Sequence, residues 1–286
     1  MSSLHEAFLG AARNRLAADV FGDAGRPVLL LHGGGQTRHA WRKTAVALAR
    51  ADWMAFAVDQ RGHGESEWVD DGSYAFGDFA ADTAAVAAEL ERRTGTAPVV
   101  IGASLGGIAS LWAAGEAPQP IFAALVLVDI TPRVDLAGVA KVQGFMRAHA
   151  RDGFGSVEEA ADAVAAYLPH RPRPRSTEGL KKNLRLSPDG RWRWHWDPRF
   201  LDGRRPVDGN RSEVEERLVA AARALTIPAM LVRGGSSELV QEEHAREFLA
   251  LVPHARFADV SGARHMVAGD RNDQFSAAIL DFLSNL

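Results

Sequence analysis

Short apolar runs alternate with helical patterns along most of the chain, and this alternation limits the available folds more than any other feature. The expected buried strands are Val28–Leu31, Met54–Val58, Val99–Ile101, Ala124–Val128, Ala229–Val232 and Phe257–Val260. The expected helices between them are Trp41–Arg50, Asp78–Arg93, Ser104–Ala114, Gln241–Leu251 and Gln274–Leu283. Because buried strands that alternate with helices form parallel sheets, we predict an α/β fold with a mostly parallel, doubly wound sheet.

The alternation stops between residues 131 and 225, where no run reads as a buried strand. Helical patterns occupy this stretch instead, at Leu136–Ala150, Ser156–Tyr167 and Ser212–Leu225. We therefore predict an α/β core formed by residues 1–130 and 226–286, with a mostly helical insert at 131–225. Within the insert, we expect the sequence HRPRPR at 170–175 to form a solvated loop.

The composition excludes several classes of protein. The chain has 286 residues, 47% of them hydrophobic, which is enough for one large core with an insert. A net charge of −3 gives no basis for binding nucleic acid or an anionic membrane, and the absence of cysteine excludes disulfides and thiolate metal sites. No apolar run approaches the ~18 residues that span a bilayer, and the N-terminal sequence lacks a signal-peptide pattern. We expect a cytoplasmic protein, and the sequence leaves a homodimer open.

A serine flanked by glycines stands where the strand Val99–Ile101 gives way to a helix. The pattern Gly102-x-Ser104-x-Gly106 is typical of a nucleophile elbow, a turn so sharp that the residues two before and two after the serine must be small. At the N-terminus of a helix, free backbone N–H groups and the helix dipole favour a developing anion. The alternative is a glycine-rich turn with an incidental serine, but the strand before and the helix after favour a nucleophile.

A second glycine-rich segment, His32-Gly33-Gly34-Gly35, follows the strand Val28–Leu31. Glycines let the backbone approach a ligand and direct an N–H group at it. The N–H groups of Gly34 and Leu105 are thus candidates for an oxyanion hole, and Gly35 is a candidate for the substrate pocket. A phosphate-binding loop is the alternative, but the segment lacks the G-x-G-x-x-G spacing and a Walker lysine.

Together these segments resemble the α/β-hydrolase superfamily. The resemblance rests on HGGG at 32–35, DQRGHGES at 59–66, GASLGG at 102–107 and GARHMVAGD at 262–270. It implies a nucleophile, an acid and a histidine in that order along the chain. Ser104 would be the nucleophile and His265, shortly after the last expected strand, its general base. The resemblance assigns the 59–66 segment a structural role, and it places Arg264 where the family usually has glycine.

Two carboxylates compete for the role of the acid, which orients the histidine and stabilises its charged form. Glu238 lies three residues after Gly235 and matches the family's G-x-x-D spacing with glutamate in place of aspartate. Asp129 ends the preceding expected strand, where some members of the family carry their acid. We prefer Glu238 and keep Asp129 as the alternative.

In the resemblance, the insert corresponds to a cap over the active site. Its sequence RWRWHWDP contains three tryptophans that are candidates for the pocket wall, Trp192, Trp194 and Trp196. The other explanation is that they pack the cap onto the core.

We expect a serine hydrolase that cleaves an ester or lactone of a small, apolar substrate without a cofactor or metal. The alternatives are C–C bond hydrolysis, perhydrolysis or cofactor-free oxygen chemistry on the same scaffold, or a small-molecule receptor with little turnover.

Overall fold

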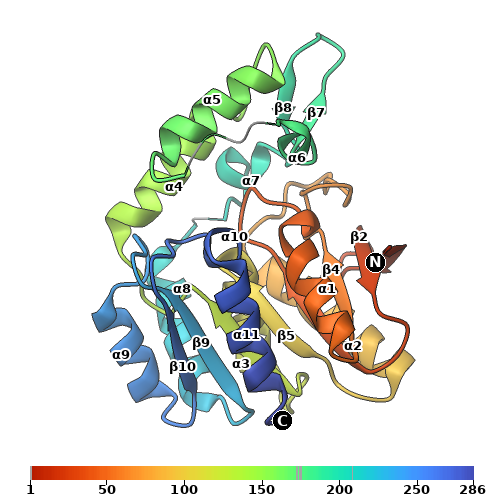
Figure 1. Ribbon diagram of the computed structural model, residues 1–286, viewed down its shortest axis with the longest axis vertical. Helices are drawn as coiled ribbons and strands as arrows, with labels where there is room; N and C mark the ends of the chain where they lie inside the picture. The colour runs from red at the N-terminus through yellow and green to blue at the C-terminus, as the bar shows by residue number, and fades with distance from the viewer. Residues whose placement is uncertain (1, 172, 174–175, 208) are drawn as a thin grey trace.

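An eight-stranded sheet forms the centre of the molecule (Figure 1), in the order β1-β2-β4-β3-β5-β6-β9-β10. The computed structural model describes residues 2–171, 173, 176–207 and 209–286. The strands are β1 (Leu4–Leu9), β2 (Arg15–Phe21), β3 (Arg26–Leu31), β4 (Trp53–Val58), β5 (Val99–Ala103), β6 (Ala124–Val128), β9 (Ala229–Gly234) and β10 (Arg256–Val260). From β4 to β10 in this order every neighbouring pair is parallel, which confirms the predicted α/β fold.

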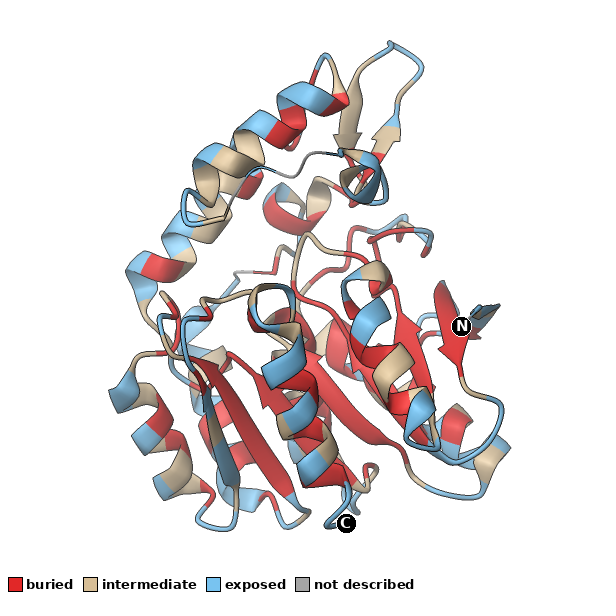
Figure 2. Cartoon of the chain, viewed as in Figure 1, coloured by how far each residue is buried: buried red, intermediate tan, exposed pale blue. Residues whose placement is uncertain are grey.

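Helices cover both faces of this sheet. They are α1 (Arg42–Arg50), which a short 3-10 helix at Arg38–Trp41 precedes, α2 (Phe76–Thr94), α3 (Leu105–Glu116), α8 (Arg211–Ala224), α9 (Glu242–Leu251), α10 (Val267–Asp270) and α11 (Asn272–Leu283). Along β3, Val28 and Leu30 pack in one cluster with α1 and α11, whereas Leu29 and Leu31 pack in another with α2, α3, α8 and α9. The parallel strands β4, β3, β5, β6 and β9 are therefore buried from both sides (Figure 2), which is why they read as continuous apolar runs, whereas the edge strand β10 is largely exposed. Among the described helices, none is both long and apolar enough to cross a membrane.

The N-terminal hairpin is a feature that the sequence analysis did not predict. Strand β1 pairs antiparallel with β2, and β2 pairs antiparallel with β4. Most of β1 is exposed, including Leu4 and Leu9, whereas β2 is buried from Leu16 onward. An edge strand that is covered on one side carries no continuous apolar run, so it gives a weak sequence signal.

The insert forms a cap above one end of the sheet (Figure 1). Its elements are α4 (Leu136–Ala148), α5 (Val157–Tyr167), α6 (Glu178–Lys181), β7 (Leu184–Leu186), β8 (Trp192–Trp194) and α7 (Arg199–Asp202). β7 and β8 form a small antiparallel sheet of their own, although no strand was expected here. The last predicted helix of the insert, α8, differs from the others because it packs against α3 and adds Leu218 and Ala222 to the core. The cap itself thus consists of residues 131–207.

Glycines bring α3 into close contact with the sheet. A Cβ atom on Gly102 would lie 2.5 Å from the backbone carbon of Gly106, and one on Gly106 would lie 2.4 Å from the carbonyl oxygen of Leu31. A Cβ on Gly107 would lie 2.4 Å from a methyl carbon of Ile130. The distance between α3 and strands β3 and β5 is therefore set by the absence of side chains.

We expect Gly106→Ala to lower the free energy of unfolding by about 3 kcal/mol, because the new methyl group meets backbone that cannot move aside. Gly144→Ala is the matched control. Gly144 lies on the exposed side of α4 with open space around its Cα, so alanine there should stabilise the helix by about 0.5–1 kcal/mol. Urea unfolding of both variants measures the difference, and equal unfolding free energies would contradict this account of the contact.

Candidate active site

Ser104 occupies the turn between β5 and α3, at the carboxyl end of a central strand. Its φ is 46° and its ψ −112°, a conformation that a residue with a side chain adopts only when its surroundings impose it. The glycine contacts of Gly102 and Gly106 supply that constraint. The serine thus sits at a strained turn directly before the first residue of a helix.

The glycine loop after β3 lies beside this serine. A Cβ on Gly33 would be 3.4 Å from the Cβ of Ser104. The N–H of Gly33 donates to Oε1 of Gln36 at 3.1 Å, and the N–H of Gly35 donates to Nε2 of His63 at 3.1 Å. Within the described part of the chain, no acceptor contacts the N–H of Gly34 or of Leu105. These two groups, predicted as an oxyanion hole, are therefore free to bind an anion at the turn.

His265 contacts a carboxylate, and that carboxylate is Asp129. Nδ1 of His265 lies 2.8 Å from Oδ2 of Asp129, whose side chain is 0% exposed. Asp129 directly follows β6 and has a φ of 49°. It also accepts hydrogen bonds from the N–H of Gly234 at 2.9 Å and from Oγ of Ser237 at 2.5 Å. A buried carboxylate with three donors is fixed in place and can orient the imidazole ring.

Glu238, the preferred candidate for the acid, does not contact His265 in the structure, whereas the alternative, Asp129, does. Glu238 accepts a hydrogen bond from Nη1 of Arg264 at 3.1 Å and lies 3.6 Å from Nζ of Lys141. Burial raises its pKa, but its own backbone amide, Arg264 and Lys141 together outweigh burial and lower the pKa. The spacing of the loop after β9 matches the family pattern, yet the side chain turns to these cations, whereas Asp129 turns to His265.

Two buried histidines support the glycine loop. Nε2 of His63 accepts the N–H of Gly35, and Nε2 of His32 accepts the N–H of Gln60 at 3.1 Å. The rings lie 5.2 Å apart between centroids. Burial lowers the pKa of His32 to about 4 and that of His63 to about 3, so both rings are neutral near pH 7. This agrees with the structural role expected for the 59–66 segment.

Cap side chains cover the glycine loop. A Cβ on Gly34 would lie 3.3 Å from the ring of Phe200, and one on Gly35 would lie 2.9 Å from Cε of Met146 and 3.7 Å from Nε1 of Trp196. Met146, Trp196 and Phe200 also share an apolar cluster with Leu105 of the core. The cap therefore places an apolar surface directly over the serine turn.

The three predicted tryptophans have different positions. Trp196 lies beside Gly35, as described above, and its ring packs on Phe200. Trp194 packs within the cap, with its ring centroid 5.2 Å from that of Phe154. The backbone of Trp192 exchanges hydrogen bonds with Phe154. Only Trp196 of the three is seen against the glycine loop, so the prediction that all three line the pocket is not supported for Trp192 and Trp194.

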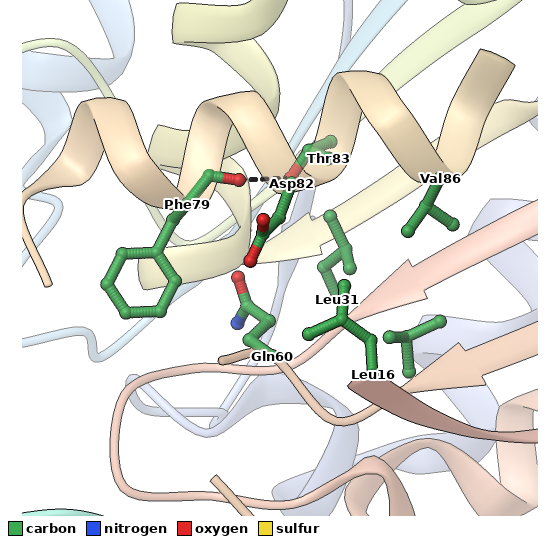
Figure 3. Close-up of a pocket in the computed structure, with 8 residues that line it drawn as sticks. Leu16, Leu31, Gln60, Phe79, Asp82, Thr83 and Val86 are labelled. Carbon is green, nitrogen blue, oxygen red and sulfur yellow. Dashed lines mark hydrogen bonds between the residues drawn. The ribbon is translucent and has the colours of Figure 1, made fainter. Parts of the chain in front are cut away.

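A small pocket of ≈ 10 Å³ lies between α2 and strands β2, β3 and β4 (Figure 3). It is lined by Leu16, Leu31, Val58, Gln60, Phe79, Asp82, Thr83 and Val86. Neither Ser104 nor His265 reaches it, and its volume is about that of one water molecule. It is a packing defect of the core, separate from the candidate active site.

Known proteins share this architecture. The profile of the alpha/beta hydrolase fold family matches residues 26–271. Esterase Rv0045c of Mycobacterium tuberculosis is 33% identical over 257 residues, which cover 88% of this chain and 80% of that protein. A solved structure of the same esterase has a TM-score of 0.77 at 29% identity, over 99% of this chain and 93% of the other. The crystal structure of an E-2-(acetamidomethylene)succinate hydrolase shares the fold, with a TM-score of 0.83 at 23% identity over 99% of both chains. The chain belongs to the alpha/beta hydrolase fold family.

The contacts of the two carboxylates give the first prediction for the site. Asp129→Asn should lower kcat for a small activated ester by about 10⁴-fold, because the amide favours the wrong tautomer of His265. Glu238→Gln is the matched control and should change kcat by less than about tenfold, since Glu238 has no contact with the ring. Steady-state kinetics of the two folded variants decides between the carboxylates, and a larger loss from Glu238→Gln would overturn the assignment.

The buried histidines predict how stability depends on pH. Their pKa values are about 4 and about 3 in the folded protein and near 6.5 in the unfolded chain, so the unfolded chain binds more protons between these values. The stabilisation is complete above about pH 6.5 and is lost as the pH falls. In His63→Gln the decline below pH 6.5 should be shallower by about 1.4 kcal/mol per pH unit, because one proton fewer is involved. Denaturant unfolding from pH 7.5 to 4.5 measures the slopes, and parallel curves would contradict the prediction.

Proposed function

We propose that this protein is a serine hydrolase that cleaves a carboxylic ester or lactone of a small, apolar molecule through an acyl-enzyme. The observation that carries the proposal is the contact between His265 and the buried Asp129, on the same side of the sheet as the strained Ser104. Asp129 follows β6, His265 follows β10 and Ser104 follows β5. The carboxyl ends of these parallel strands lie at the same edge of the sheet. The similarity to an esterase of Mycobacterium tuberculosis supports an ester as the substrate class.

The mechanism follows from the atoms that each group presents. Because Nδ1 of His265 binds Asp129, Nε2 is the nitrogen that takes the proton of Ser104 as the hydroxyl attacks the carbonyl carbon. The N–H groups of Gly34 and Leu105 bind the oxygen that becomes negative. Protonated His265 then gives its proton to the leaving alcohol. A water molecule, deprotonated by the same ring, hydrolyses the acyl-enzyme and returns Ser104.

The apolar cover of the site favours an apolar substrate. Met146, Trp196 and Phe200 lie at the two glycines of the oxyanion loop, and none of them carries a charge. Such a wall excludes water from the reacting carbonyl and binds an acyl or alcohol group by contact area. A serine at the turn also separates this chain from members of the superfamily that use aspartate as the nucleophile.

Replacement of the serine tests the proposal. Ser104→Ala should leave the fold intact and reduce ester turnover by on the order of 10⁶-fold. A fluorophosphonate should label the wild-type protein on Ser104, as identified by peptide mass spectrometry, and should not label the variant. Ser110→Ala is the control, since Ser110 is fully buried on α3 and donates to the carbonyl of Gly106.

Three other outcomes would contradict the proposal. Labelling of a different serine would remove Ser104 as the nucleophile. Turnover of diketones or formation of peracids in the absence of ester cleavage would indicate C–C hydrolysis or perhydrolysis on the same scaffold. Tight binding of a small molecule with turnover near zero would indicate a receptor.

A further inference from the structure

The loop that carries His265 is tied to the cap through one carboxylate, Asp270. Oδ2 of Asp270 accepts the backbone N–H of Arg264, the residue before the histidine, at 2.9 Å. Oδ1 accepts Nε of Arg171 at 2.5 Å. Arg171 follows α5 in the cap, so Asp270 joins the cap directly to the backbone beside His265.

Arg171 lies in the stretch that the sequence analysis expected to be a solvated loop. Pro172, Pro174 and Arg175 of that stretch lie outside the described residues. Contrary to that expectation, the side chain of Arg171 packs against the protein and is only 29% exposed. Its Nη2 lies 3.4 Å from the carbonyl oxygen of Met266, the residue after the histidine. A Cβ on Gly269 would lie 3.0 Å from the same nitrogen, so the guanidinium fits closely against the loop.

The ion pair between Arg171 and Asp270 is largely buried, so its loss should affect the position of the loop. The Asp270 side chain is 7% exposed, and besides Arg171 the ring of His170 approaches it, with Nε2 3.8 Å from Oδ1. A mostly buried pair is screened less than an exposed one, and the loss of one partner leaves an uncompensated charge. By contrast, the second link between cap and loop, from Lys141 through Glu238 to Arg264, is more exposed and contributes less.

We propose that Asp270 is a positioning residue, through which Arg171 of the cap holds His265 in the orientation that Asp129 and Ser104 require. The inference rests on the proposed function. Arg171 fixes one side of the histidine through Asp270 and Arg264, and the other through Met266. The position of the imidazole therefore depends on the docking of the cap. When the cap lifts from the loop, the backbone on both sides of His265 loses its support from Arg171 and only the contact with Asp129 remains, so turnover is coupled to closure over the substrate.

Removal of the cation is the direct test. Arg171→Ala should lower kcat for a small activated ester by about 10- to 100-fold with little change in KM, because misplacement of the base affects the chemical step more than binding. Arg171→Lys should recover part of the loss, since an ammonium group can pair with Asp270 but cannot also reach Met266. Asp270→Asn keeps an acceptor for the N–H of Arg264 but removes the charge, and should resemble Arg171→Ala.

A second cap arginine supplies the control. Arg151 pairs with Asp202 at 2.5 Å, but its side chain is 72% exposed and the pair does not contact the histidine loop. Arg151→Ala should leave kcat unchanged. If it lowers kcat as much as Arg171→Ala does, or if Arg171→Ala lowers only the melting temperature, Asp270 has no positioning role.

An NMR measurement separates this proposal from the proposed function. In the wild-type protein the Nδ1 proton of His265, shared with Asp129, should give a downfield signal, assigned by its absence in His265→Gln. The signal should broaden or disappear in Arg171→Ala and persist in Arg151→Ala. This readout needs no turnover, so it tests the positioning of His265 even where esters are not hydrolysed. A signal unchanged in Arg171→Ala and in Asp270→Asn would overturn the inference, and Arg171→Lys serves if Arg171→Ala does not fold.

Discussion

The close approach of α3 to strands β3 and β5 is the constraint on which the rest of the site depends. Gly102, Gly106 and Gly107 stand where any side chain would meet backbone or a packed methyl group. Because of this contact, only one residue separates the end of β5 from the start of α3, and that residue, Ser104, has a positive φ. It also brings the first N–H of α3 to the glycines that follow β3. Ser104 and the N–H groups of Gly34 and Leu105, the proposed nucleophile and oxyanion hole, are thus placed by the packing of one helix.

Much of the core could be predicted from the sequence because its inner parallel strands are buried on both faces. The strand at Ala124–Val128 was predicted with the bounds that the structure has, and the other predicted core strands differ only at their ends. Elements that are covered on one side gave weaker signals, as in the N-terminal hairpin. The packing partner of α8 could not be read from its helical pattern, because an amphipathic helix can bury its apolar side against a cap or a sheet alike.

The site was predictable to the extent that backbone position determines it. Ser104, Gly34 and Leu105 lie where strand ends and glycines indicated, since those features act through the backbone. The choice between Glu238 and Asp129 depended on the direction of a side chain. Loop spacing does not determine that direction. Here it follows from donors on β9 and in the loop after it that contact Asp129, and from cations that contact Glu238. The role of Arg171 was hidden for the same reason, because its partner is 99 residues away along the chain.

The place where the cap leaves the core has an evolutionary consequence. The cap begins at residue 131, two positions after the carboxylate that contacts His265, and the chain returns to the core at α8. Cap segments that do not contact the histidine loop can lengthen, shorten or be exchanged without rethreading the sheet, so substrate range can diverge while Arg171 keeps its contact with Asp270. The departure point itself cannot drift, because any shift there moves Asp129. A change in the length of the cap is therefore tolerated beyond this point, whereas an insertion or deletion between β6 and Asp129 would displace the carboxylate from His265.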